Sequence, residues 1–154
     1  CIRDRMTAIG QMQAEAEGTI LPAGSDFRGK CILLVEDNEL NSEITVEILN
    51  EYGFMVDTAE NGAEAVEKIR NSAPGDYELV LMDIQMPLMD GYEATKHIRN
   101  LKLKGISDIP VVAMSAETYD SARFIEAEMN YYLPKPADPD RIYAAMEQIF
   151  NRVN

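Results

Sequence analysis

The chain has 154 residues, of which 46% are hydrophobic, and this size and composition fit one soluble globular domain with a single core. Twenty-seven acidic against 14 basic residues leave a net charge of −13, which repels nucleic acid and anionic lipid, so we expect no direct binding to either. No apolar run approaches the ~18 residues that a membrane span needs, and Cys1 and Cys31 lie far apart in a chain without a signal-peptide pattern. We therefore expect reduced thiols and a cytoplasmic location, even if the parent protein is anchored in a membrane.

Residues 1–29 differ in kind from the rest of the chain. They contain DRMTAIGQMQAEAE, which could hold a weak helix, and then GTILPAGSDFRGK, whose Gly and Pro residues favour a linker. From residue 30 onward, strand and helix patterns alternate, with strands expected at about 31–36, 54–59, 78–83, 109–114 and 131–134. Such alternation predicts a parallel sheet, and the continuous apolar runs predict an α/β fold that is doubly wound, with helices on both faces.

The helical segments carry amphipathic patterns and capping signals. In NELNSEITVEILNEYG, Leu40, Ile44 and Ile48 recur at a spacing of four, which predicts that they pack on the sheet, with Asn38 as N-cap and Gly53 at C′. Further helices are expected at about 61–73, at 92–100, between Ser115 and the last strand, and at 138–151.

Four of the predicted strands run into polar residues at their carboxyl ends. These residues are Glu36 and Asp37, Asp83, Ser115, and Lys135. Because the carboxyl ends of parallel strands converge on one crevice of an open sheet, we expect three carboxylates, a hydroxyl and an ammonium in one pocket. Taken singly, each has an ordinary alternative, since acids after strands often serve turns and caps, and serine and lysine are common at the surface.

The residue types in this pocket favour phosphate chemistry with a hard cation. Three carboxylates at one place raise one another's pKa unless a cation lies among them, and oxygen donors without Cys or His select Mg²⁺, Ca²⁺ or Mn²⁺. A few carboxylates together with waters and a phosphoryl oxygen suit Mg²⁺ best. Mg²⁺ and Lys135 would offset the charge of a phosphoryl group, for which Asp83 is the natural nucleophile.

Four motifs in this order carry a resemblance to a known family. The stretches ILLVEDNELN, LVLMDIQMPLMDGYEAT, AMSA and YLPKP resemble the receiver domain of two-component response regulators, of the kind found at the C-terminus of hybrid sensor histidine kinases. The likeness covers about residues 30–151 and implies a receiver domain at 30–154 with a flavodoxin-like (βα)5 sheet of strand order 2-1-3-4-5. Its chemistry would be that of a Mg²⁺-dependent phosphoprotein in a phosphorelay.

The resemblance also implies roles for single residues. It makes Asp83 the phosphoacceptor that forms an aspartyl phosphate, and it gives Lys135 the binding of the phosphoryl group. The Mg²⁺ ligands would be Glu36, Asp37, Asp83 and the backbone carbonyl of Gln85. A cis peptide bond is implied before Pro136, which is physically reasonable because cis bonds are essentially confined to proline.

A conformational switch is implied by the same matching. In receivers a strand-end hydroxyl moves toward the new phosphoryl group, and an aromatic residue three positions before the lysine turns inward; here these are Ser115 and Tyr132. For Tyr132 the alternative is simple core packing with its hydroxyl at the surface. The expected partner surface is formed by the last two strands and the fourth and fifth helices, where a homodimer would also form.

The expected function is therefore a phosphoacceptor that takes its phosphoryl group from a histidine kinase or a histidine phosphotransfer protein. It would then lose the group to water or to a downstream histidine, as a module of a hybrid sensor histidine kinase. One alternative is a stand-alone response regulator. A phosphohydrolase of the haloacid dehalogenase type is a weaker alternative, because it needs a second aspartate two residues after the nucleophile, where this chain has Gln85.

The sequence departs from the family pattern before the last strand. Between Ser115 and Lys135 it is about two residues shorter than expected, and Glu128 stands where glycine is usual. Glycine there would serve a left-handed helix end, a conformation that costs other residues ~1 kcal/mol or more. We therefore expect the fourth helix to be short or displaced.

Overall fold

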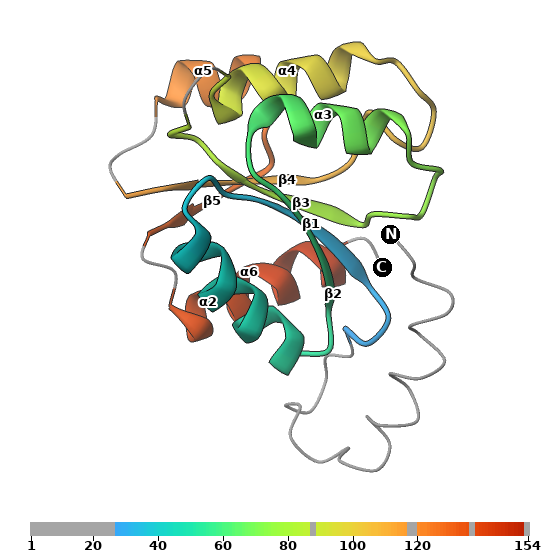
Figure 1. Cartoon of the computed structure of the whole chain (residues 1–154). Coiled ribbons are helices and arrows are strands. Elements are labelled where there is room, and N and C mark those ends of the chain that lie inside the picture. The colour runs from blue at the N-terminus through green and yellow to red at the C-terminus, as the bar shows by residue number, and fades with distance from the viewer. Residues whose placement is uncertain (1–26, 87–88, 117–119, 136–137, 153–154) are drawn as a thin grey trace.

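The structure is a computed structural model that describes residues 27–86, 89–116, 120–135 and 138–152, with the side chains of 151 and 152 left aside (Figure 1). Most of the predicted linker at 1–29 and the predicted cis peptide before Pro136 lie outside these ranges. Within the described ranges, none of the helices combines the length and the apolar character needed to cross a membrane.

A five-stranded parallel sheet forms the centre of the domain. Its strands are β1 (Cys31–Val35), β2 (Met55–Ala59), β3 (Leu79–Asp83), β4 (Val111–Ser115) and β5 (Tyr131–Pro134). They are ordered β2-β1-β3-β4-β5 and every neighbouring pair is parallel, which confirms the predicted fold class and strand order. All residues of β1, β3 and β4 are buried, as their continuous apolar runs predict.

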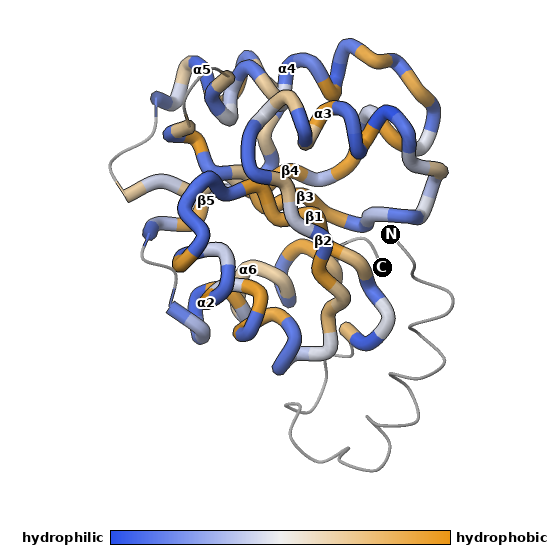
Figure 2. The backbone as a smooth tube through the Cα atoms, in the orientation of Figure 1, coloured by the Kyte–Doolittle hydropathy of each residue, from blue (hydrophilic) through white to orange (hydrophobic). Residues whose placement is uncertain are grey.

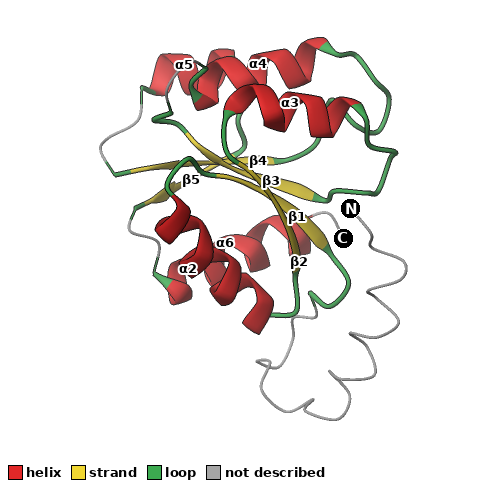
Figure 3. Cartoon of the chain, viewed as in Figure 1, coloured by secondary structure: helices red, strands yellow, loops and turns green. Residues whose placement is uncertain are grey.

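Five described helices cover both faces of the sheet. They are α2 (Glu39–Glu51), α3 (Gly62–Arg70), α4 (Gly91–Asn100), α5 (Ser121–Glu126) and α6 (Pro139–Arg152). Helices α2 and α6 lie on one face, and α3, α4 and α5 lie on the other (Figures 1 and 3). Four of them begin at side-chain caps, because the side chains of Asn38, Asn61, Asp90 and Asp120 accept hydrogen bonds from backbone N–H groups of the first turn.

Each face of the sheet has its own apolar core. Between them, the hydrophobic residues of the central strands appear as orange segments in the middle of the fold (Figure 2). Successive residues of β1 alternate between the two cores: Leu33 and Val35 pack toward α3 and α4, whereas Ile32 and Leu34 pack toward α2 and α6. This alternation follows from the two-residue period of a strand. The sheet is thereby fixed from both sides, which leaves its edge at the carboxyl ends of the strands to present polar groups.

The predicted packing face of α2 was wrong in part. Ile48 is buried as expected, but Leu40 is 64% exposed and Ile44 48% exposed, whereas Thr45 and Leu49 are buried beside Ile48. At 100° per residue, the buried stripe centred on these three residues lies about 90° from Ile44 and about 130° from Leu40. A spacing of four drifts around the helix, so only the last member of the predicted stripe reaches the sheet.

Several boundaries also differ from the prediction. Strand β4 begins at Val111 and not near residue 109, because Pro110 has no N–H to donate to the ladder. Helix α3 ends at Arg70 with Asn71 as its C-cap, three residues before Pro74, whereas the prediction ran to residue 73. Helix α5 has six residues and is followed by Glu128 at φ 61°, so the predicted short fourth helix is confirmed.

Candidate functional site

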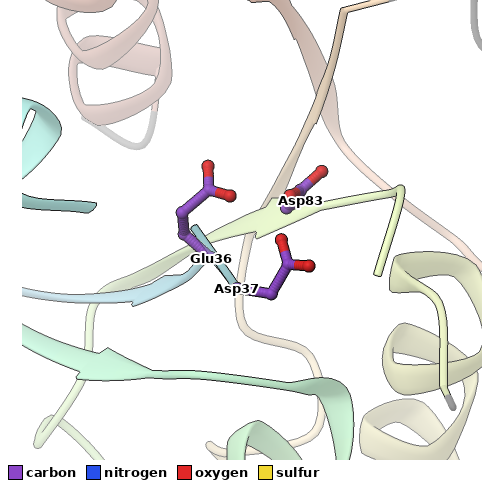
Figure 4. A group of neighbouring side chains, drawn as sticks. All are labelled: Glu36, Asp37 and Asp83. Carbon is purple, nitrogen blue, oxygen red and sulfur yellow. The ribbon is translucent and has the colours of Figure 1, made fainter. Parts of the chain in front are cut away.

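The polar residues at the strand ends gather at one edge of the sheet. Glu36 follows β1, Asp83 ends β3, Ser115 ends β4 and Lys135 follows β5; the first three are between 2% and 4% exposed. Figure 4 shows the carboxylates of Glu36, Asp37 and Asp83 next to one another. Backbone hydrogen bonds continue the ladder into the loops: Glu36 N donates to the Ala59 carbonyl at 3.0 Å, and Lys135 N donates to the Ser115 carbonyl at 2.8 Å.

The Lys135 ammonium lies between two buried carboxylates. Its Nζ donates to Glu36 Oε1 at 2.6 Å and to Asp83 Oδ2 at 3.2 Å. The second oxygen of each carboxylate accepts from a loop N–H, with Asn38 N at 3.2 Å from Glu36 Oε2 and Gln85 N at 3.0 Å from Asp83 Oδ1. Each acid is therefore held at both oxygens, which fixes its orientation toward the lysine.

The site disfavours ionisation of Asp83 next to the Glu36 carboxylate. Burial, followed by the neighbouring Glu36 carboxylate, raises the pKa of Asp83 to about 7, although Lys135 and the Gln85 N–H act in the opposite direction. Burial by itself would lower the pKa of Lys135, but its hydrogen bonds and ion pairs with Glu36 and Asp83 raise it above the ordinary value. One ammonium thus does not fully compensate the two buried acids.

Asp37 adds a third carboxylate on the solvent side. It is exposed, and one oxygen from each of Glu36, Asp37 and Asp83 lies within 4.8 Å of the others. With Lys135 the ionised group carries two negative charges, the amount that one divalent cation neutralises. The Gln85 side chain is exposed; its backbone N–H contacts Asp83, and the role of its carbonyl as a metal ligand remains a prediction.

The two predicted switch residues are in contact through the backbone. The Tyr132 hydroxyl donates to the Ser115 carbonyl at 3.3 Å, and the half-buried ring packs against the core on the α3–α5 face. Ser115 is 2% exposed and forms the end of β4, next to the strand that carries Asp83. A shift at the end of β4 would therefore reach Tyr132 directly.

Sequence reasoning missed a glycine that supports Asp83. A Cβ on Gly91 would lie 2.5 Å from the Asp83 carbonyl oxygen and 2.8 Å from Ile84 Cα, and Gly91 N donates to the Ile84 carbonyl at 3.0 Å. The start of α4 thus rests on the backbone of the acid. Asp90 and Gly91 directly precede the helix predicted at 92–100, but the close approach of Gly91 to Asp83 depends on tertiary packing.

Comparisons with known proteins agree with this geometry. Residues 32–147 match the family model of the response regulator receiver domain. Hybrid signal transduction histidine kinase B from Dictyostelium discoideum is 39% identical over 126 residues, covering 75% of this chain and 6% of that kinase. The peroxide stress-activated histidine kinase mak1 from Schizosaccharomyces pombe is 30% identical over 152 residues, covering 97% of this chain and 9% of the kinase. The chain thus spans less than a tenth of the length of these two kinases.

A shorter relative and a solved structure extend the comparison. The two-component response regulator ORR41 from rice (Oryza sativa subsp. japonica) is 41% identical over 115 residues, covering 72% of this chain and 87% of that protein. The receiver domain of a sensor histidine kinase from Pseudomonas aeruginosa PAO1, solved with a magnesium ion in its active-site cleft, superposes with a TM-score of 0.68. It is 30% identical, with 77% of this chain and 95% of that chain covered. Together with the fold and the acidic cluster, these matches show that the chain belongs to the response regulator receiver domain family.

Proposed function

We propose that this receiver domain accepts a phosphoryl group on Asp83 in a Mg²⁺-dependent reaction. The observation that carries the proposal is the position of Asp83 at the end of β3: it is buried, paired with the Lys135 ammonium at 3.2 Å, and within reach of two further acids. A carboxylate in such surroundings is a nucleophile with a cationic partner already in place.

The donor set fits Mg²⁺. The site offers carboxylate oxygens from Glu36, Asp37 and Asp83, and its excess of two negative charges is relieved by one divalent cation. Ligand oxygens around Mg²⁺ lie ~2.1 Å from the ion and hence up to ~4.2 Å apart, so the observed spacing within 4.8 Å needs only small adjustments. Bound there, the ion would supply charge neutralisation for the incoming phosphoryl oxygens, and the Gln85 carbonyl is proposed as a further ligand.

The transfer itself is a substitution at phosphorus. An Asp83 carboxylate oxygen attacks the phosphorus of a partner's phosphohistidine, an O–P bond forms as the N–P bond breaks, and the imidazole leaves with the electron pair. Lys135, which binds Asp83 in the free protein, would move its hydrogen bond to a phosphoryl oxygen. Reversal onto another histidine, or attack by water, returns Asp83 to its carboxylate.

The proposed donor is a histidine kinase or a histidine phosphotransfer protein. Ser115 and Tyr132 are proposed to report phosphorylation to the surface of β4, β5, α5 and α6, and their contact through the Ser115 carbonyl supports this role. We place the domain in a hybrid histidine kinase, with residues 1–29 as the preceding linker. The match to mak1 supports this placement because it extends over nearly the whole chain, whereas the match to the rice response regulator covers 72% of it.

Incubation of the chain with Mg²⁺ and acetyl phosphate, followed by intact mass spectrometry, tests the proposal. The expected result is the gain of one hydroxylamine-labile phosphoryl group that depends on Mg²⁺ and is absent in Asp83→Asn. The matched control is Asp57→Asn, because Asp57 is also a strand carboxylate in an ion pair but lies on β2 and binds Lys68. Equal phosphorylation of Asp83→Asn would refute the assignment, and turnover of small phosphate esters would favour a phosphohydrolase instead.

A further inference from the structure

Helix α5 is attached to the domain largely through polar contacts. None of its six residues, all of which the structure describes, is buried, and the half-buried Phe124 is its contribution to the core. Two ion pairs join it to α4: Lys96 with Glu126, and Arg123 with Asp90 at 3.0 Å. Figure 1 shows the two helices next to each other on one face of the sheet. A helix with little buried apolar surface depends on such contacts for its position.

One of these ion pairs involves the residue that starts α4. Asp90 Oδ1 accepts from Glu93 N at 2.9 Å and so caps the helix, while Asp90 Oδ2 accepts from Arg123 Nη2 at 3.0 Å. The next residue, Gly91, is in close contact with the Asp83 and Ile84 backbone. Two consecutive residues therefore connect the backbone of Asp83 to α5: Gly91 contacts that backbone, and Asp90 binds Arg123 of α5.

Tyr92 strengthens this connection from α4. The Arg123 guanidinium lies over the Tyr92 ring at 4.4 Å from its centroid, and the Tyr92 hydroxyl accepts from Asp120 N, the N-cap residue of α5, at 2.8 Å. Tyr92 is 3% exposed, so its ring is a fixed support. We define the latch as Asp90, Tyr92, Asp120 and Arg123: two residues at the start of α4 that hold two residues at the start of α5.

We propose that this latch couples phosphorylation of Asp83 to the position of α5, by a route that does not pass through Ser115 and Tyr132. The proposal rests on Asp83 being the phosphoacceptor. A phosphoryl group on Asp83 competes for the Gln85 N–H and for Lys135, which moves the backbone that follows Asp83. Gly91 N donates to the Ile84 carbonyl, and the start of α4 packs so closely on this backbone that even a Cβ at Gly91 would meet the Asp83 carbonyl oxygen. Asp90 therefore follows the movement and pulls on Arg123. The element whose equilibrium changes is α5.

Hydrogen exchange of α5 with and without phosphorylation provides the test. The full chain is kept with Mg²⁺ and acetyl phosphate throughout exchange, intact mass is recorded on the same samples, and amide exchange is followed in peptides covering 121–127. In the unphosphorylated protein, Arg123→Gln is expected to speed exchange there roughly fivefold, since it loses both an ion pair and a cation–π contact. The wild type should show a phosphorylation-dependent change in these peptides that Arg123→Gln lacks.

Two further variants make the result specific. Asp90→Asn keeps the helix cap, since asparagine is a good N-cap, but its amide N–H₂ would face the Arg123 donor, so it should also abolish the phosphorylation-dependent change. Lys96→Gln removes the other α4–α5 ion pair, which does not touch the acceptor loop, and should retain that change. If phosphorylation alters α5 exchange equally in wild type and in both latch variants, or leaves α5 unaltered in a wild type whose mass shows the phosphoryl group, the latch is refuted. Absence of any mass gain would instead refute the proposed function.

Discussion

Asp83 is expected to destabilise the folded domain when it is ionised and no cation is bound. Its pKa is raised from 3.8 to about 7 in the folded state, first by burial and then by Glu36. Between these two values the folded protein holds a proton that the unfolded chain has lost, so the free energy of unfolding falls as the pH rises. The rise of this pKa from 3.8 to about 7, at ~1.4 kcal/mol per pH unit, gives an upper limit of about 4 kcal/mol.

Asp83→Asn removes this penalty, and its cost is that the amide N–H₂ faces the Lys135 ammonium in place of Asp83 Oδ2. The asparagine oxygen can still accept from Gln85 N, and Lys135 keeps Glu36 as its nearer partner at 2.6 Å, so no buried ammonium is left unpaired. At alkaline pH in the presence of a chelator, we therefore expect Asp83→Asn to be more stable than wild type by about 2–4 kcal/mol. The difference should be smaller at about pH 5 than at about pH 8, disappear only below pH 3.8, where Asp83 is protonated in both the folded and the unfolded chain, and shrink when Mg²⁺ is added at alkaline pH.

Urea unfolding followed by circular dichroism measures these differences, at about pH 5 and about pH 8, with chelator or with Mg²⁺. Asp57→Asn is the matched control, because the pKa of Asp57 is lowered in the folded state whereas that of Asp83 is raised. Burial tends to raise the pKa of Asp57, but hydrogen bonds from Tyr77 at 2.5 Å and Lys68 at 3.0 Å lower it overall. Its contribution to stability is present above pH 3.8 and is lost as the pH falls through its folded pKa. Parallel pH curves for wild type and Asp83→Asn would refute the reasoning.

Substitutions at three further positions test the packing by chemical denaturation: Gly91 beside Asp83, and Glu128 and Arg99 near the amino ends of β4 and β5. Gly91→Ala should cost about 2–3 kcal/mol, because its Cβ would meet backbone atoms of Asp83 and Ile84; a gain in stability, which alanine usually gives over glycine at an exposed helix position, would contradict the close contact. Glu128→Gly should be more stable than Glu128→Ala by about 1 kcal/mol, since at φ 61° the alanine Cβ is strained and glycine has none. Equal stabilities of the two variants would contradict backbone strain at this position. Arg99→Met should cost about 3 kcal/mol, because Arg99 donates to the Glu128 and Ile109 carbonyls among four acceptors; a loss under about 1 kcal/mol would show that water replaces it.

The sheet was largely predictable because its strands are buried on both sides. Short continuous apolar runs such as CILLV and VVAM are typical of strands that are buried on both faces. Each of the two falls within two residues of an observed strand. Periodicity cannot order the strands, however, and the order 2-1-3-4-5 came from the resemblance. Boundaries were less certain where a single residue decides them, as at Pro110.

The acidic cluster was also accessible from sequence, for a topological reason. Residues that follow parallel strands must meet at one edge, so Glu36, Asp83 and Lys135 could be brought together without coordinates. The contacts that surround these residues could not be predicted from the sequence. Arg123 and Asp90 are 33 residues apart, neither follows a strand, and no local pattern links a short helix to the cap of another. Such pairs depend on how two helices lie side by side, which the strand pattern leaves open.

The error on α2 follows from the balance of forces on that helix. The helix has no basic residue, and it carries four glutamates at a spacing of four, at positions 39, 43, 47 and 51. Their mutual repulsion opposes helix formation, and so does the negative charge of Glu51 at the C-terminal end of the helix dipole. Burial of Ile48 and Leu49 must overcome both effects, and it fixes the rotation of the helix about its axis. Leu40 and Ile44 are left on the solvent side as a consequence. An apolar spacing of four therefore identifies the helix, but the residues that contact the sheet determine which face is buried.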